Sequence, residues 1–146
     1  MRGKFSVNAT AYIALSCYLL LMPFGWVVSV LLAAAVHELG HCVAIWMAGG
    51  RIYSIQIGLF GAKIETGYLT DRDILFCALA GPAAGMLLCL FFRWIPTVAA
   101  CGLIQTLFNL IPLHPFDGGR ALRAAGRMLK DKAVAKSSSS VYNNPN

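Results

Sequence analysis

The chain has 146 residues, which limits it to one ordinary domain. Hydrophobic residues make up 58% of it and charged residues 12%, whereas soluble domains contain about 45–50% and 25%. Its formal net charge is +6 and its mean hydropathy is +0.68. This composition excludes a soluble globular domain, a disordered chain, a collagen and a disulfide-rich scaffold, and it predicts an integral membrane protein.

The first uncharged stretch predicts two membrane helices. Between Lys4 and Arg51 lie 46 residues with one formal charge, that of Glu38. As a helix this stretch would be about 69 Å long, which is roughly two crossings of a ~30 Å hydrocarbon core. Pro23 lies where a turn between the two helices is needed. The first membrane segment is therefore expected at about 5–22.

A secretory signal peptide is the alternative interpretation of residues 1–22. Arg2 and Lys4 would then form its basic start. The apolar run continues well past a normal signal core of about 7–15 residues, which favours an uncleaved first span.

The second segment contains the sequence His37-Glu38-Leu39-Gly40-His41. On a helix, His37 and His41 differ by about 40° in azimuth, so both imidazoles point the same way one turn apart. Two imidazoles at that separation can bind one Zn²⁺, and Glu38 between them is placed to activate its water. A polar patch on a helix face is disfavoured, because these ionisable residues are costly in an apolar span unless they have a function.

A period-2 pattern follows this helix. From Tyr53 to Leu59 apolar side chains alternate with Ser, Gln and Gly, which is typical of a β-strand, and residues 61–66 could form a returning strand. A strand edge beside a zinc site could bind an extended substrate segment by β-augmentation. A hairpin that only packs on the membrane face is the alternative.

Two more uncharged stretches, 74–92 and 94–116, complete four predicted membrane segments. Lys and Arg residues precede the first segment and follow the last one, so the positive-inside rule predicts that both termini are cytoplasmic. The 51–73 loop then lies on the same side, while Arg93 faces outside. The net charge of +6 therefore indicates topology and attraction to anionic lipid, and not nucleic-acid binding.

Small and apolar side chains in these segments are predicted to pack. Five cysteines lie in apolar segments without a CxxC pair, which indicates packing and neither disulfides nor metal ligation: Cys17, Cys42, Cys77, Cys89 and Cys101. Two stripes of small residues predict close helix contacts: Gly40, Ala44 and Ala48, and Gly81 and Gly85.

A catalytic zinc site needs at least a third protein ligand and an open position for water. The candidates in this chain are Asp117, His114, Glu65, Asp71 and Asp73. Asp117 stands out because two prolines and two glycines interrupt the apolar segment around it. Irregular backbone at membrane depth is tolerated only where it is buried in protein or lines a wet cavity. A loop that leaves Asp117 in solvent is the alternative.

Together these motifs resemble those of the site-2 proteases, which are membrane-embedded zinc metalloproteases. His37–His41 is similar to the family's HExxH motif. Residues 109–120 are similar to its second signature, Asn-x-x-Pro-x-x-Pro-x-Asp-Gly-Gly-Arg. Ala80-Gly81-Pro82 resembles the family's intermediate AGP element, but Gly85 stands where an Asn often follows. The segment Gly58-Leu59-Phe60-Gly61 resembles the branch that contains the stage-IV sporulation protease.

The uncharged stretches and the period-2 pattern together predict an all-α membrane bundle of about four transmembrane helices, with a short β-hairpin after the HExxH helix. The membrane domain is expected over residues 1–136. Residues 137–146 are rich in Ser and Asn and are predicted to form a disordered polar tail.

The resemblance implies roles for single residues. His37, His41 and Asp117 would bind Zn²⁺, and a water would fill the fourth position. Glu38 would be the general base. Asn109 would lie near the substrate backbone or the oxyanion, although a structural hydrogen bond between helices is an alternative for it.

The sequence therefore predicts an intramembrane zinc endopeptidase that cuts a membrane-tethered protein in or near its transmembrane segment. A catalytically silent membrane scaffold or chaperone of the same fold is the alternative. The intact residues His37, Glu38, His41 and Asp117 argue against it, whereas Gly85 and the short C-terminus leave room for it. A small transporter is disfavoured because the ionisable residues form one compact set and not a path across the bilayer. A regulatory membrane partner or a homo-oligomer could shield the site.

Overall fold

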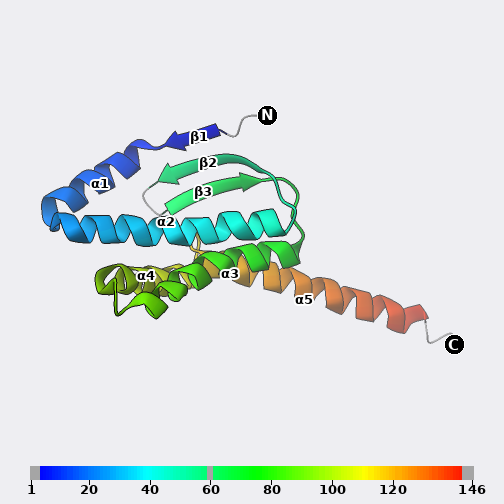
Figure 1. Ribbon diagram of the computed structural model, residues 1–146. Coiled ribbons are helices and arrows are strands. Elements are labelled where there is room, and N and C mark those ends of the chain that lie inside the picture. Colours follow the sequence, from blue (N-terminus) through cyan, green and yellow to red (C-terminus); the bar gives the residue numbers. More distant parts are fainter. Residues whose placement is uncertain (1–3, 59–60, 143–146) are drawn as a thin grey trace.

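The computed structural model describes residues 4–58 and 61–142, with side chains as far as residue 135. Most of the described chain is helical, and a small sheet lies along one helix (Figure 1). In chain order the elements are β1 (Lys4–Val7), α1 (Ala9–Leu21), α2 (Phe24–Met47), β2 (Ile52–Gly58), β3 (Gly61–Thr66), α3 (Asp71–Leu87), the 3-10 helix η1 (Leu88–Phe91), α4 (Pro96–Asn109) and α5 (Asp117–Tyr142).

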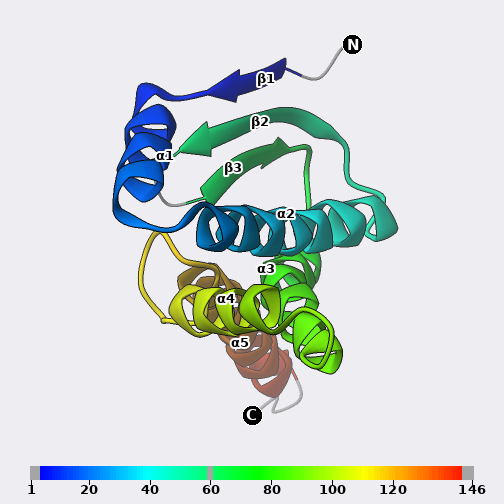
Figure 2. The same ribbon diagram turned by 60° about the vertical axis from the view of Figure 1, so that its left-hand side comes forward.

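The helix α2 is the central element. The strands lie on one side of it, and α3, α4 and α5 lie on the other, as two views show (Figures 1 and 2). It contacts β3 on the sheet side and both α3 and α4 on the helical side. The sheet has the order β1-β2-β3, in which β1 is parallel and β3 antiparallel to β2. One face of α2 therefore lies toward the sheet, and its opposite face lies toward the other helices.

Local sequence signals account for several helix ends. The turn expected at Pro23 separates α1 from α2. After α2 the chain turns at Gly49, whose φ of 71° is readily adopted only by glycine. Thr70 and Asp73 form a reciprocal capping box at the start of α3. Pro96 begins α4, where its missing N–H costs nothing.

The hairpin predicted after the HExxH helix is confirmed. Its strands β2 and β3 pair in antiparallel register from Ile52 opposite Thr66 to Gly58 opposite Gly61. Leu59 and Phe60, which belong to the predicted strand and to the glycine-flanked segment, lie outside the described residues.

The sequence pattern does not predict β1. Residues 5–7 are expected in the first membrane segment, but Lys4–Val7 instead pair in parallel with the strand that follows α2. The pairing extends into Asn8, whose amide donates to the carbonyl oxygen of Ile57 at 2.8 Å. The pattern of a short apolar run does not distinguish a helix from a strand. Here the run forms a strand because it pairs with β2, which is distant in the sequence.

Two helical segments are long and apolar enough to cross a membrane. These are α2, with 24 residues, and Asp71–Phe91, with 21. The apolar helix α1 has 13 residues and α4 has 14, so each is about 20 Å long, short of a ~30 Å hydrocarbon core. The expected segments 5–22 and 94–116 are therefore shorter as helices, and four crossings stay a prediction.

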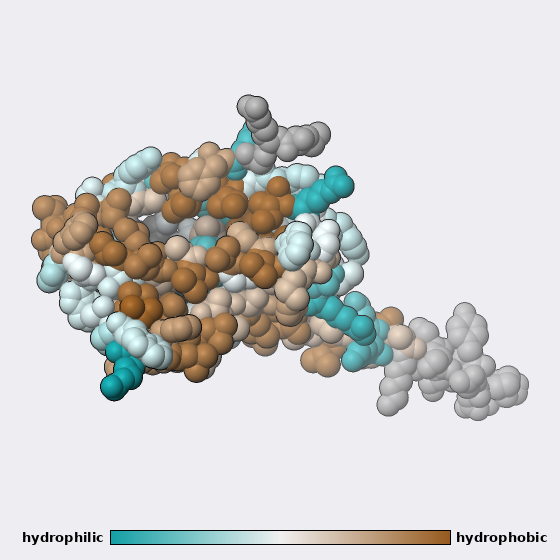
Figure 3. Space-filling model, viewed as in Figure 1, coloured by the Kyte–Doolittle hydropathy of each residue, from teal (hydrophilic) through white to brown (hydrophobic). Residues whose placement is uncertain are grey.

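Small side chains fill the interior and large apolar ones cover the surface. Among the described residues the largest fully buried side chain is that of Thr106, whereas Leu20 is 85% exposed and Trp46 is 77% exposed. Hydrophobic residues dominate the surface over α1 and α2 (Figure 3). Helices pack this way in lipid, where large side chains gain nothing from burial and small ones let backbones approach closely. The five cysteines are free, as predicted.

Both described ends of the chain lie at the end of the molecule where α2 stops and α3 starts, on the right in Figure 1. The helix α5 projects from the bundle there and extends to Tyr142. The predicted polar tail, 137–146, falls on residues whose side chains, and from 143 on whose backbone, lie outside the described part. It stays a prediction.

Candidate metal centre

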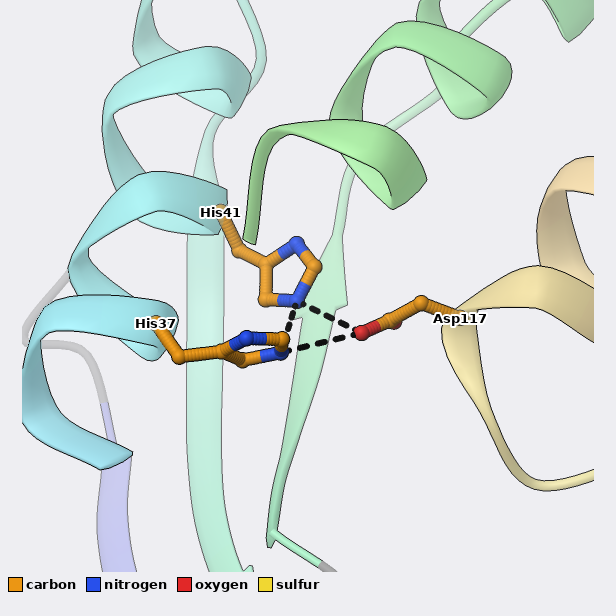
Figure 4. A group of neighbouring side chains, drawn as sticks. All are labelled: His37, His41 and Asp117. Carbon is orange, nitrogen blue, oxygen red and sulfur yellow. Dashed lines mark hydrogen bonds and ion pairs between the residues drawn. The ribbon is translucent and has the colours of Figure 1, made fainter. Parts of the chain in front are cut away.

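Three side chains from two helices converge on one point inside the molecule (Figure 4). His37 and His41 extend from α2, and Asp117 is the first residue of α5. The Nε2 atoms of the two histidines are 3.2 Å apart. Oδ2 of Asp117 lies 3.1 Å from Nε2 of His37 and 3.0 Å from Nε2 of His41. The three residues are only 2%, 4% and 7% exposed.

The spacing of these three atoms fits one metal ion. Zn²⁺ binds imidazole nitrogen and carboxylate oxygen at about 2.0–2.1 Å, and tetrahedral geometry then separates two ligand atoms by about 3.3 Å. The distances of 3.0–3.2 Å between the three ligand atoms lie close to that value. The donors are those that zinc prefers, so this set of residues fits the metal that the sequence predicts.

The backbone of α3 orients His41. Its Nδ1 lies 2.7 Å from the carbonyl oxygen of Cys77. A carbonyl oxygen can only accept, so Nδ1 carries the proton of the neutral ring and Nε2 keeps its lone pair free for a metal. Histidines that bind metals usually have such a support on their other nitrogen.

Two glycines allow α2 and α3 to approach closely enough for this contact. A Cβ atom on Gly81 would overlap the ring of His41, and one on Gly40 would lie 2.7 Å from the carbonyl oxygen of Ala80. Gly81 is therefore the residue that lets the imidazole lie against α3. The predicted role of these small residues in close helix packing is confirmed at both positions.

The irregular segment between α4 and α5 brings Asp117 to the histidines. Helix α4 ends at Asn109, and residues 110–116 form a series of turns before α5 begins. Side chains on Gly118 or Gly119 would overlap the backbone of this loop. The helix break expected from the prolines and glycines is present. The alternative that leaves Asp117 in solvent is wrong, because the residue is buried.

The Asp117 carboxyl group is held in its charged form. Burial raises the pKa of this carboxyl group, but when the rings of His37 and His41 are protonated their hydrogen bonds and charge outweigh burial, so the pKa lies well below its ordinary value. The second oxygen, Oδ1, lies 3.6 Å from Nη1 of Arg120. A carboxylate must be deprotonated to bind a metal, and this environment provides that state.

The other four candidates for a third ligand lie elsewhere. Glu65 accepts a hydrogen bond from a serine of β2, and Asp71 forms an ion pair with an arginine of α5. Asp73 caps α3, and His114 is exposed in the loop before α5. Within the described part of the chain, the group that could bind a metal consists of His37, His41 and Asp117.

The Glu38 carboxylate is anchored at one oxygen and free at the other. The backbone N–H of Ala62, at the start of β3, donates to Oε1 at 3.0 Å. The other oxygen, Oε2, is buried and has no hydrogen-bond partner among the described residues. Gly61, with a φ of 109°, sets this turn, and a Cβ atom there would lie 3.1 Å from Oε1. Sequence reasoning missed this contact, because a backbone amide leaves no trace in residue type.

An apolar cavity of about 570 Å³ reaches Glu38. Residues of α1, α2, α4 and the closed end of the hairpin line it, and most of them are apolar, among them Trp26 and Phe108. Asn109 is also part of its wall, and its Nδ2 lies 3.4 Å from Nε2 of His37. The cavity therefore joins a largely apolar wall to the polar residues at the metal centre.

Thr106 of α4 occupies the space beside Gly85. A Cβ atom on Gly85 would overlap the hydroxyl of Thr106 and would lie 3.8 Å from Nδ1 of His37. The threonine hydroxyl donates to the carbonyl oxygen of Pro82 at 3.2 Å. The motif that Gly85 departs from often has an asparagine at this position of the AGP helix. In this chain the polar group beside position 85 is instead the hydroxyl of Thr106, from the neighbouring helix α4.

Two curated relatives align with most of this chain. The protein named Rip3 in Mycobacterium tuberculosis is 32% identical over 126 residues, which cover 71% of this chain. The protein named sll0528 in Synechocystis is 34% identical over 118 residues, which cover 68%. Both carry the name of a candidate zinc metalloprotease. Each alignment covers 31% of the relative, so the chain spans about a third of the length of these relatives. No protein-family model matches the chain.

A solved structure has a similar fold. The site-2 protease from Methanocaldococcus jannaschii superposes with a TM-score of 0.70 over 82% of this chain and 65% of that one, at 24% sequence identity. The chain therefore has the site-2 protease fold. Together with the curated relatives, this similarity confirms the resemblance to the site-2 proteases that the two motifs indicate. The sporulation branch stays a prediction.

Proposed function

We propose that this chain, a member of the site-2 protease family, is a zinc endopeptidase that cuts a membrane-tethered protein within or near its transmembrane segment. The observation that carries the proposal is the convergence of His37, His41 and Asp117 beside Glu38, where an apolar cavity ends. An apolar wall suits a substrate segment that comes from lipid, and the buried polar groups supply what hydrolysis of a peptide bond needs.

In this proposal His37, His41 and Asp117 would hold Zn²⁺, which would supply Lewis acidity for the hydrolysis when bound. Glu38 takes the proton of the attacking water on Oε2, the oxygen without a partner, and later gives it to the leaving amine. The amide of Ala62 keeps Oε1 in place, so the carboxylate does not rotate away from the water.

Asn109 is proposed to bind the substrate at the same place. Its side chain lies beside the ring of His37 and lines the cavity. An amide N–H there can donate to the carbonyl oxygen of the scissile bond, where negative charge develops during attack. This position favours the oxyanion role over a purely structural bond between helices.

The outer edge of β3 is proposed to hold the substrate in an extended form. β3 is an edge strand, and its neighbour across that edge is α2. The N–H of Ala62 points to this edge, and in a strand every second amide faces the same way. A peptide added there would lie next to Glu38, which supports β-augmentation as the way in which a substrate helix is held after unwinding.

The chain is proposed to be a multi-pass membrane protein with both termini in the cytoplasm. Its described ends lie at the end of the molecule where α2 stops and α3 starts (Figure 1). The sequence places most Lys and Arg residues at that end, as the positive-inside rule requires. In this arrangement α1 and α4 cross together with the segments that flank them. A regulatory membrane partner or a second copy of the chain stays a prediction.

A cleavage assay tests the proposed function. The purified full chain is reconstituted in liposomes with a panel of single-span membrane proteins that carry a label at each end. We expect cleavage that is lost when a chelator removes the metal and that returns when zinc is added. A protein that binds zinc at full occupancy but cuts no member of the panel would favour the silent scaffold.

A further inference from the structure

A second cavity, of about 300 Å³, lies outside the metal centre and carries a different chemistry. Three arginines of α5 line it together with apolar residues of α2, α3 and the loop before α3. The proposed hydrolysis uses none of these arginines. The cavity is therefore basic and apolar at the same time, and its function is not explained by catalysis.

The three arginines share one face of α5. Arg120, Arg123 and Arg127 are three and four residues apart, so their side chains line up along the helix. Arg127 is held by Asp71, whose Oδ1 lies 2.7 Å from its Nε and 2.6 Å from its Nη2. Arg120 has one carboxylate within reach, that of Asp117 at 3.6 Å.

Arg123 differs from the other two. Among the described residues no carboxylate lies within ion-pair distance of its guanidinium group, although it lines the same cavity. Asp117 is within reach of Arg120, and Asp71 and the charge of Asp131 act on Arg127, so among the described residues Arg123 is the guanidinium group of this face that has no carboxylate within ion-pair distance. A guanidinium group offers two parallel N–H donors that match a phosphate or a carboxylate.

The apolar part of the wall indicates where in the membrane the cavity lies. Ile45 is two residues from the end of α2, and Ile74 is in the first turn of α3. These helices contain the two candidate membrane spans, so the cavity lies where both spans meet the polar boundary of the bilayer. Hydrophilic residues gather at this end of the molecule (Figure 3). Lipid phosphate groups occupy the same depth.

We propose that this cavity binds the phosphate group of an anionic phospholipid of the cytoplasmic leaflet, with Arg123 as its main ligand. The guanidinium groups bind the phosphate oxygens, while Leu69 and Ile74, which are only partly buried, contact the glycerol and the first acyl carbons. Arginines that only fix the orientation of the chain in the membrane need to lie on the cytoplasmic side, but they do not need to line a common cavity. Their convergence on a cavity with an apolar wall is what points to one bound lipid and not to a diffuse attraction.

Arg123 is the residue that tests the site with the least disturbance. Arg120 contacts the metal ligand Asp117, and Arg127 ties α5 to α3, so changing either one also disturbs other parts of the molecule. The matched control is Arg72→Gln. Arg72 is exposed at the start of α3 and does not line the cavity, so the substitution removes the same charge at the same end of the molecule.

The experiment measures retained lipid on the purified full chain by native mass spectrometry after extraction from vesicles of phosphatidylglycerol and phosphatidylcholine. Wild type and Arg72→Gln should retain one phosphatidylglycerol in preference to phosphatidylcholine. Arg123→Gln should bind it about tenfold more weakly or worse, as expected for loss of a charge-assisted hydrogen bond. Arg123→Lys keeps the charge but loses the two parallel N–H donors, so its affinity for phosphatidylglycerol should lie between those of the wild type and Arg123→Gln. This variant provides the test if Arg123→Gln does not fold.

Other outcomes would overturn the proposal. Equal weakening in Arg123→Gln and Arg72→Gln would mean that net charge alone attracts lipid. The absence of any preference for phosphatidylglycerol in the wild type would contradict an anionic lipid site. Inorganic phosphate that displaced the lipid at millimolar concentration, through Arg123, would assign the cavity to a soluble phosphate compound. An acidic peptide that did so would assign it to a protein partner.

Discussion

The two oxygens of the Glu38 carboxylate have different environments, and this difference gives the group a defined role. One oxygen accepts a hydrogen bond from the amide of Ala62, and the other is buried and has no hydrogen-bond partner within the described part of the chain. The group that could bind a metal consists of His37, His41 and Asp117, so Glu38 is not part of it.

We therefore expect Glu38→Gln to abolish cleavage while zinc content stays near one ion per chain. A positioned general base contributes roughly 10²–10⁴-fold to such reactions, and the amide of Gln keeps the shape without the basicity. The measurements are the cleavage rate in liposomes and zinc by elemental analysis of the same preparation. Cleavage at the wild-type rate would show that another group takes the proton.

Asp117 provides the one anionic donor of the cluster, so it should dominate metal retention. Asp117→Asn replaces a charged oxygen by a neutral one in a buried site. Mutating a residue that only hydrogen-bonds to a metal ligand typically lowers metal affinity about 10–100-fold, so changing a ligand itself should lower zinc affinity at least as much. His114→Ala, in the exposed loop, is the control and should keep its zinc. Zinc competition with a chromophoric chelator measures both. Full zinc in Asp117→Asn together with loss in His114→Ala would reverse the assignment.

The amide of Ala62 can be removed without removing a side chain. Proline is tolerated on an edge strand when its missing N–H faces outward, as that of Ala62 does. Ala62→Pro should lower kcat about tenfold or more, because the bond to the charged Glu38 is lost. Zinc content should not change.

Ile64→Pro is the matched control for that substitution. It removes the next outward amide of the same edge, two residues away from the bond to Glu38. Ile64→Pro should raise KM if a substrate strand pairs with this edge, whereas Ala62→Pro, which removes the N–H bound to Glu38, should lower kcat. An unchanged kcat in Ala62→Pro would mean that the bond to Glu38 does not contribute to catalysis.

Among the helices, the contact of α2 with α3 depends on a missing side chain. Gly81→Ala places a methyl group against the ring of His41, so α3 must move away, and the chain should lose zinc together with about 1–3 kcal/mol of stability. Gly126→Ala is the control, since nothing lies within 4 Å of a Cβ atom there and a helix gains from alanine. Thermal unfolding in detergent and zinc content compare the two. A stable Gly81→Ala protein with full zinc would contradict the close contact.

The sequence predicts those elements whose signals are local. His37 and His41 are one helical turn apart, so any helix in this place brings them to one face. The hairpin is indicated by its alternating pattern, and the break before Asp117 by its prolines and glycines. Each of these predictions needs only the residues of the element itself.

Other elements depend on partners that the local sequence does not name. Lys4–Val7 form a strand only because β2 lies beside them, and the same apolar residues fit a longer helix equally well. The support of His41 by Cys77 and of Glu38 by Ala62 comes from backbone atoms, which every residue type has. For this reason the candidate metal ligands could be named from the sequence but the groups that orient them could not.

For the molecule as a whole, the proposed topology places both ends of the chain on one side of the membrane. In a background without native cysteines, Lys4→Cys and Lys132→Cys should both react with a membrane-impermeant maleimide only after the cytoplasmic side is opened. Reaction of one of them from outside the cell would contradict four crossings. It would also change the membrane depth inferred for the metal centre and for the basic cavity.

The parallel pairing of β1 with β2 sets an order of events during synthesis. Lys4 pairs with Ser54, so the first strand leaves the ribosome 50 residues before its partner does. At about 5–20 residues per second, this is a delay of roughly 3–10 s. In that interval α1 and α2 are made, and β1 can pair only after the chain has passed through both helices and returned with β2. If the proposed topology holds, α1 and α2 enter the bilayer before the sheet forms, and a chain whose α1 fails to insert should not add its first strand.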